Sequence, residues 1–168
     1  MEKSTLNLAL YVAKIHVGLK ATKDTEVVAL YGNGYFVSDE GHSGGRYYIN
    51  RDRSVTLHTV IGVDDIIEQV ELSQGIEIPS GISPPYDALI SPQLETMPVV
   101  DKNISFGMMP DELINILGSQ KSEKRDGKKR IIEYEATEET DTRVLMNYSA
   151  TYTFIEDKLV KVSLYDGC

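Results

Sequence analysis

The chain has 168 residues, of which 41% are apolar and 26% charged, a composition typical of globular proteins and too apolar for a disordered chain. Its 17 basic and 26 acidic residues give a formal net charge of −9. This balance argues against general nucleic-acid binding, because phosphate contacts need a basic surface. It favours a basic or mixed-charge protein as partner.

The cysteine content and the hydropathy pattern bear on the compartment. A single cysteine, Cys168, excludes an intrachain disulfide and fits a reducing environment. The apolar stretch 6–17 is interrupted by polar residues and is far shorter than the roughly 20 residues of a membrane-spanning helix. It also lacks the cleavage site of a signal peptide. We expect no membrane span and a cytoplasmic location, with a periplasmic or secreted location as the alternative if a signal has been removed.

The first part of the chain contains two segments with helical patterns. Apolar residues in 6–13 alternate as in a strand, yet they also follow the i, i+3, i+4, i+7 spacing of a helix face, and we expect a helix there. Segment 24–32 has acids in its first turn and ends on Gly32, the pattern of a two-turn helix.

Alternating residues after this helix predict an antiparallel sheet with strands at 46–50, 54–60 and 66–73. The alternation also assigns the two faces of the sheet. The residues predicted to face the helix are Tyr47, Ile49, Val55, Leu57, Val70 and Leu72.

A proline-rich segment follows. Five of the six prolines lie between residues 74 and 101. Proline removes a backbone donor and disfavours helix in the residue before it, so this segment cannot form a central strand. We interpret 75–100 as a linker.

The second half repeats the order of the first. Pro110 to Gly118 predicts another helix closed by glycine, and strands are expected at 129–136, 144–155 and 158–165. The two helices align without a gap, and the acidic pairs before the last strand of each half also align. We therefore predict an α+β protein made of two tandem repeats, 1–74 and 101–168. Each repeat would pack short helices on one face of a three- or four-stranded antiparallel sheet.

Two motifs carry a family resemblance. Ile104-Ser-Phe-Gly-Met-Met-Pro-Asp-Glu-Leu-Ile-Asn-Ile-Leu-Gly118, with Phe154-Ile-Glu-Asp-Lys-Leu-Val-Lys-Val162, resembles the unit of beta-lactamase inhibitor proteins. That family carries the unit in tandem, and small outer-membrane assembly lipoproteins carry it singly. The resemblance implies the fold. The inhibitors have a disulfide in each repeat and the lipoproteins a lipidated cysteine near the start, so the target does not carry over to this chain.

Residue types that could support catalysis are scattered. The three histidines show no metal-ligand spacing, and we expect no metal and no cofactor. The basic segment 121–130 is interpreted as a solvated hairpin turning at Asp126-Gly127, with an acidic-partner contact as the alternative. The acids in 133–141 lack the order of a calcium loop. Without a nucleophile and base placed together, we predict that the protein is not an enzyme.

Ten tyrosines, with no tryptophan and three phenylalanines, suggest a binding surface, because tyrosine offers a large contact area with a polar tip. Packing in the sheet is the alternative, and for Tyr48 and Tyr165 both readings stay open. The face opposite the helices is predicted to bind the partner. The residues expected to do so are Arg46, Tyr48, His58, Glu133, Glu135, Lys161 and Tyr165.

The leading hypothesis is a non-enzymatic inhibitor or immunity-type protein that binds another protein, of basic character, through this face. A structural or assembly module of the bacterial envelope is the alternative. A third hypothesis is a small-ligand binder or enzyme that uses the cleft between the repeats, with His42 or His58 as base.

Overall fold

The structure is a computed structural model that describes residues 8–18, 20–39, 42–79, 86–120, 122–139 and 145–167. Its helices are short and its strands dominate, which confirms the α+β class. The helices are α1 (Asp24–Tyr31), α2 (Tyr86–Leu89) and α3 (Pro110–Leu117), with 3₁₀ turns at Val63–Asp65 and Asp101–Asn103. The strands are β1 (Tyr11–Val12), β2 (Ile15–His16), β3 (Tyr35–Asp39), β4 (His42–Ile49), β5 (Val55–Ile61), β6 (Ile67–Gln74), β7 (Ser122–Asp126), β8 (Lys129–Glu139), β9 (Leu145–Ile155) and β10 (Lys158–Gly167).

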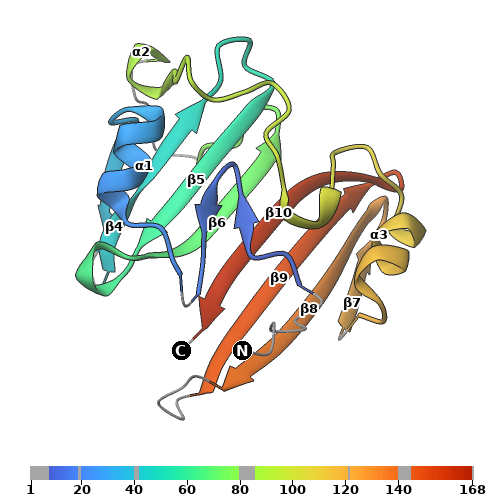
Figure 1. The fold of residues 1–168 in the computed structure, drawn as a ribbon. Coiled ribbons are helices and arrows are strands. Elements are labelled where there is room, and N and C mark those ends of the chain that lie inside the picture. The colour runs from blue at the N-terminus through green and yellow to red at the C-terminus, as the bar shows by residue number, and fades with distance from the viewer. Residues whose placement is uncertain are drawn as a thin grey trace.

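One antiparallel sheet spans the molecule (Figure 1). Its eight strands run in the order β3-β4-β5-β6-β10-β9-β8-β7. The four strands after α1 and the four strands after α3 thus form two halves that meet where β6 pairs with β10. That pairing runs from Ser73 opposite Lys161 to Gln69 opposite Tyr165. The ladder hydrogen bonds therefore continue across the junction.

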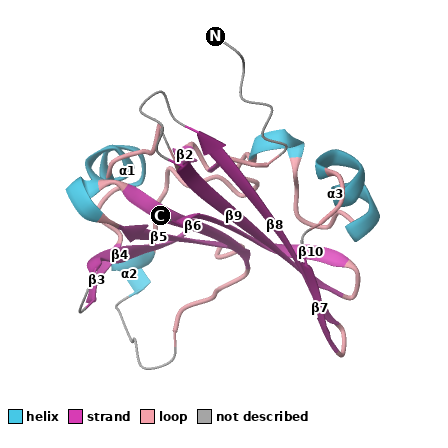
Figure 2. Ribbon diagram, turned by 90° about the horizontal axis from the view of Figure 1, so that it is seen from below, coloured by secondary structure: helices cyan, strands magenta, loops and turns pink. Residues whose placement is uncertain are grey.

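The helices divide between the two faces of this sheet. Figure 2 shows α1 and α3 on one side and α2 on the other. Val27 of α1 and Leu113 of α3 are fully buried in the main core, whereas Leu89 of α2 packs with Tyr47 and Ile49 of β4 in a separate small cluster. We call the side that carries α1 and α3 the helix face, and the opposite side the polar face.

Sequence features mark the start of α3 and the ends of both α1 and α3. Pro110 occupies the first turn of α3, where a missing N–H costs nothing, and the carboxylate of Glu112 accepts a hydrogen bond from the N–H of Met109 at 3.2 Å. Gly32 and Gly118 end the two helices with φ of 89° and 86°, a conformation that other residues adopt only with strain. Both predicted helices are confirmed.

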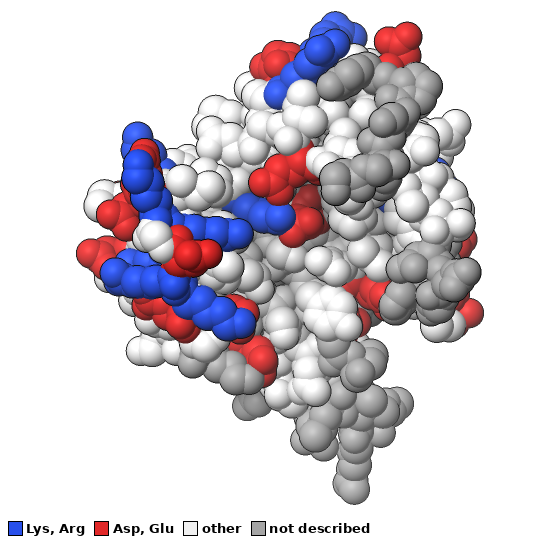
Figure 3. Space-filling model, turned by 180° about the vertical axis from the view of Figure 1, so that it is seen from behind, with Lys and Arg blue, Asp and Glu red and all other residues white. Residues whose placement is uncertain are grey.

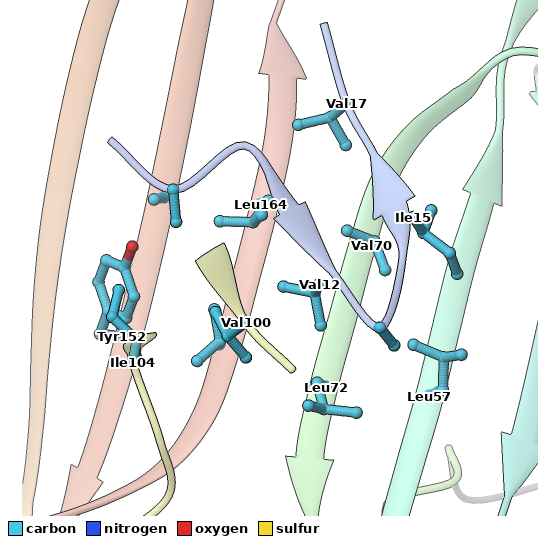
Figure 4. Close-up of a cluster of buried hydrophobic side chains, with 14 of the residues drawn as sticks. Val12, Ile15, Val17, Leu57, Val70, Leu72, Val100, Ile104, Tyr152 and Leu164 are labelled. Carbon is cyan, nitrogen blue, oxygen red and sulfur yellow. The ribbon is translucent and has the colours of Figure 1, made fainter. Parts of the chain in front are cut away.

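The hydrophobic core on the helix face is continuous between the halves. Figure 4 shows Val12 and Ile15 of the β1–β2 hairpin above Val70 of β6 and Leu164 of β10. Val100 closes the same layer, and its backbone bridges that of Val12. Since the main cluster draws residues from both halves, neither half buries its own core alone.

The N-terminal segment is not the helix that we predicted. Its described part, from residue 8, contains the β1–β2 hairpin, which turns at Ala13 and Lys14 with φ of 51° and 66°. Residues 6 and 7 lie outside the described part. The N–H of Ala13 donates to the carbonyl oxygen of Val99 at 2.8 Å. The partner that stabilises the extended conformation lies far away in the sequence, and local periodicity does not report it.

The proline-rich segment packs against both faces where it is described. Leu89 lies on the polar face, while Leu94 and Val100 are buried in the core of the helix face. Ile90 forms a parallel bridge with Ile49 at the end of β4. The segment thus passes from one face of the sheet to the other and adds apolar residues to each.

Candidate protein-binding face

The polar face is organised by the register of the sheet. Side chains directly opposite one another on neighbouring strands share a face and touch. One such row, which we call the central row, crosses six strands from β4 to β8. It consists of Tyr47, His58, Glu71, Ser163, Thr151 and Glu133.

Five of the predicted binding residues lie on this face. His58 and Glu133 belong to the central row, and Lys161 lies beside it on β10. Glu135 and Tyr165 both oppose Ser149 in the neighbouring row. Figure 3 shows acidic and basic side chains interleaved on this face, with the basic ones gathered toward the β7–β8 edge.

Two predicted residues lie on the helix face instead, so their assignment was wrong. Tyr48 is 0% exposed, and its hydroxyl donates to the carbonyl oxygen of Gly32 at 2.8 Å. Arg46 donates from Nε and Nη2 to Asp24 of α1, at 2.8 and 3.0 Å. The alternation misled because α1 covers one face of β4 and α2 the other, so that Tyr47, Tyr48 and Ile49 are all buried.

Several close polar and aromatic contacts on the polar face surround Lys161. The rings of Tyr47 and His58 stack with centroids 4.1 Å apart and planes 6° from parallel. Nδ1 of His58 lies 3.9 Å from the carboxylate of Glu71. Nζ of Lys161 lies 3.2 Å from the carboxylate of Glu71 and 2.9 Å from that of Glu77. We call these five side chains the Lys161 cluster.

The charges in this cluster stabilise one another. Burial alone would raise the pKa of Glu71, but the adjacent His58 and Lys161 outweigh it and hold this pKa below its usual value. Burial would lower the pKa of Lys161, and Glu77 and Glu71 reverse the effect and raise it. Both groups therefore stay ionised near neutral pH.

Two hollows flank the Lys161 cluster. The first has a volume of about 430 Å³ and lies between the Tyr47–His58 stack and Ile76 and Ile78. The second, of about 300 Å³, lies over β8, β9 and β10, where Thr151 and Ile155 contribute to its walls. Glu71, Glu77 and Lys161 line both hollows, so the Lys161–Glu77 ion pair separates them.

A close approach of backbone positions His58. A side chain at Gly45 would place its Cβ 2.4 Å from the carbonyl oxygen of Thr59 and 3.1 Å from Nε2 of His58. Only glycine fits against the Thr59 carbonyl oxygen at this point of β4, and the imidazole of His58 lies beside it. Gly45 therefore lets β4 and β5 approach closely next to His58.

Three members of the cluster were missing from the predicted binding residues. Tyr47 was assigned to the wrong face, because helices cover both faces of β4. Glu77 follows the last strand of its half and reaches the cluster only because the chain folds back, where its N–H donates to Oγ1 of Thr56 at 3.0 Å. Alternation with Val70 and Leu72 puts Glu71 on the correct face, and its position opposite His58 in an antiparallel pair is a signal that could have identified it.

The basic segment forms the predicted hairpin at the edge of the sheet. β7 and β8 pair from Ser122 opposite Glu133 to Asp126 opposite Lys129, and the turn lies at Gly127 and Lys128. Glu123 receives hydrogen bonds from Arg130 and Arg125, which hold its pKa at about 2 although burial acts against them. Part of the positive charge is thus neutralised within the hairpin.

Metal binding, membrane insertion and the second candidate base also bear on the function of the described part of the chain. No group of three or more histidine, cysteine or acidic side chains there could hold a metal ion. None of the helices in the described ranges combines the length and apolar character needed to cross a membrane. His42, the other candidate base, lies in β4, but its side chain is outside the described part. Comparisons with family models, curated proteins and solved structures find no match for this chain.

Proposed function

We propose that this protein binds another protein through the polar face of its sheet and acts as an inhibitor or immunity-type protein rather than as an enzyme. The observation that carries this proposal is the central row. Its members from His58 to Glu133 are half-buried polar side chains that continue across five strands, with hollows beside them. Mixed polar and aromatic character with partial burial is typical of non-obligate interfaces.

The contrast between the two faces supports the proposal. The helix face is covered by α1, α3 and the β1–β2 hairpin, whereas the polar face over the second half carries Tyr165 and Ile155 with 43% and 47% of their surfaces exposed. Exposed aromatic and aliphatic side chains on a rigid sheet provide contact area at little entropic cost. The net charge of −9 favours a basic partner through electrostatic steering.

We further propose that the two halves are diverged copies of one unit, as in the inhibitor family that the sequence resembles. The residue two positions before each helix binds the first part of the last strand. The N–H of Ile67 donates to the carbonyl oxygen of Thr22, and that of Leu159 donates to the carbonyl oxygen of Met108, both at 2.9 Å. The resemblance rests on these arrangements and on the sequence motifs alone.

Affinity capture from cells of the native organism, followed by mass spectrometry, tests the function. Wild-type protein and a variant with Glu135→Lys and Tyr165→Ala on the polar face would be used as baits in parallel. We expect one protein to be enriched by the wild type and lost with the variant. Equal recovery by both baits would contradict binding through this face.

A further inference from the structure

The hollow beside Tyr47 and His58 has walls of two kinds. The stacked rings form one side and Ile76 lies on another. An aliphatic chain placed between them would contact apolar surface on both sides. The carboxylates of Glu71 and Glu77 provide the polar side. Such a combination matches a long side chain with an apolar stem and a charged head.

The hollow has more carboxylates than ammonium groups. Glu71 and Glu77 carry two negative charges, and Lys161 supplies one positive charge. Among these three groups, one negative charge remains. Nζ of Lys161 contacts Oε2 of Glu77, and this is the only ion pair of Glu77 among the described residues. The Glu77 side chain is 52% exposed.

We propose that this hollow binds one arginine side chain from a loop of the partner, an inference that rests on the proposed function. The guanidinium would lie between Glu77 and the ring wall, and its methylene stem would lie along Ile76. Arginine fits better than lysine, because its planar head stacks on rings and binds a carboxylate through two parallel hydrogen bonds.

Lys161 competes with this arginine for the same carboxylates. Its ammonium group lies within 3.2 Å of Glu71 and 2.9 Å of Glu77 in the free protein. Removing the ammonium group should therefore strengthen arginine binding, while removing the charge of Glu77 should weaken it. A purely structural role of the ion pair would not give effects of opposite sign.

A titration of the full-length, isotope-labelled protein followed by NMR tests this inference. The probe is the peptide acetyl-Gly-Arg-Gly-amide, and the matched control peptide carries citrulline, which has nearly the same shape but no charge. We expect the arginine peptide to shift the signals of the His58 ring and the Ile76 amide, and the citrulline peptide to leave them unchanged. Similar shifts with both peptides, or none with either, would refute the arginine site.

Two variants complete the test, each checked for an unaltered fold by its amide spectrum. Glu77→Gln should weaken binding of the arginine peptide about two- to fivefold, the range expected for one partly exposed ion pair. Lys161→Met should tighten it by a similar factor. Weaker binding by Lys161→Met would overturn the competition that the geometry implies. Because no partner protein is present, these outcomes do not depend on whether the polar face binds a protein.

Discussion

At the residue scale, Tyr48 and Tyr134 show how a tyrosine can be buried in this sheet. Each hydroxyl donates to the carbonyl oxygen of the glycine that ends the helix of its half, at 2.8 Å in both cases. Burial raises the pKa of Tyr48 to about 12, although the nearby Arg46 opposes this, so the group remains a donor over the physiological range. The hydroxyl thus satisfies one carbonyl group at the end of each helix.

Replacing Tyr48 or Tyr134 by Phe removes this hydrogen bond and leaves the glycine carbonyl without its tyrosine donor. We expect each substitution to lower the free energy of unfolding by about 1 kcal/mol, measured by urea denaturation. Tyr48→Ala should cost about 3–5 kcal/mol, because it also leaves a cavity.

Tyr165→Phe serves as the control, since Tyr165 lies on the polar face with 43% of its surface exposed. Its free energy of unfolding should match that of the wild type. A Tyr48→Phe variant as stable as this control would show that the Gly32 contact contributes nothing.

The same residues show what the sequence could and could not predict. Alternation assigned the faces of β5, β6, β8 and β10 correctly, because each of these strands has one apolar face in the core. It failed for Arg46 and Tyr48 because β4 is covered on both sides, and a strand buried on both faces carries no alternation to read.

At the scale of elements, three turns between paired strands in the described part of the chain share one backbone conformation. Ala13 and Lys14, Asp64 and Asp65, and Glu156 and Asp157 all adopt positive φ, between 50° and 66°. This geometry matches the right-handed twist of paired strands. Glycine adopts it without strain, asparagine and aspartate with mild strain, and all other residues with more strain. The β9–β10 turn therefore retains an unfavourable conformation that substitution can relieve.

Asp157→Gly should raise the free energy of unfolding by about 0.5–1 kcal/mol. Glycine adopts φ of 62° without strain, and we expect this relief to outweigh the larger loss of chain entropy that glycine suffers on folding. Denaturation by urea would measure the change. The matched control is Lys158→Gly, one residue later in β10, which should destabilise the protein. If both glycine variants lost stability, strain in this turn would be too small to matter.

Elements with local signals were predicted well, and those held by distant partners were not. The two longer helices and the six longer strands have caps, periodicity and turn residues of their own. The β1–β2 hairpin is extended because Val12 pairs with Val100 and the N–H of Leu10 donates to Asp101 at 2.9 Å. No local pattern in 6–17 reports those contacts, which explains why a helix was expected there.

At the scale of the whole molecule, the halves are joined by both sheet and core. β6 and β10 pair through five consecutive residues, and one apolar cluster contains Val27 and Leu57 from the first half together with Leu113 and Phe154 from the second. The sequence predicted one sheet in each half, but it did not predict that the two sheets join, because register between distant strands depends on packing rather than on local pattern.

A shared core predicts cooperative unfolding of the whole chain. Scanning calorimetry should show one transition, with a calorimetric enthalpy equal to the van't Hoff enthalpy. Two resolved transitions, or a van't Hoff enthalpy near half the calorimetric value, would mean that each half folds as an independent unit.

We propose above all that the polar face binds a partner protein. The most direct test is isothermal titration calorimetry of the captured partner with two matched variants. Tyr165→Ala and Phe36→Ala each remove one aromatic ring of similar exposure, 43% and 45%, from the polar face and from β3 on the helix face, respectively. We expect Tyr165→Ala to raise the dissociation constant about tenfold or more and Phe36→Ala to leave it unchanged. If Tyr165→Ala left the dissociation constant unchanged and Phe36→Ala raised it, the partner would bind the helix face, and binding through the polar face would be contradicted.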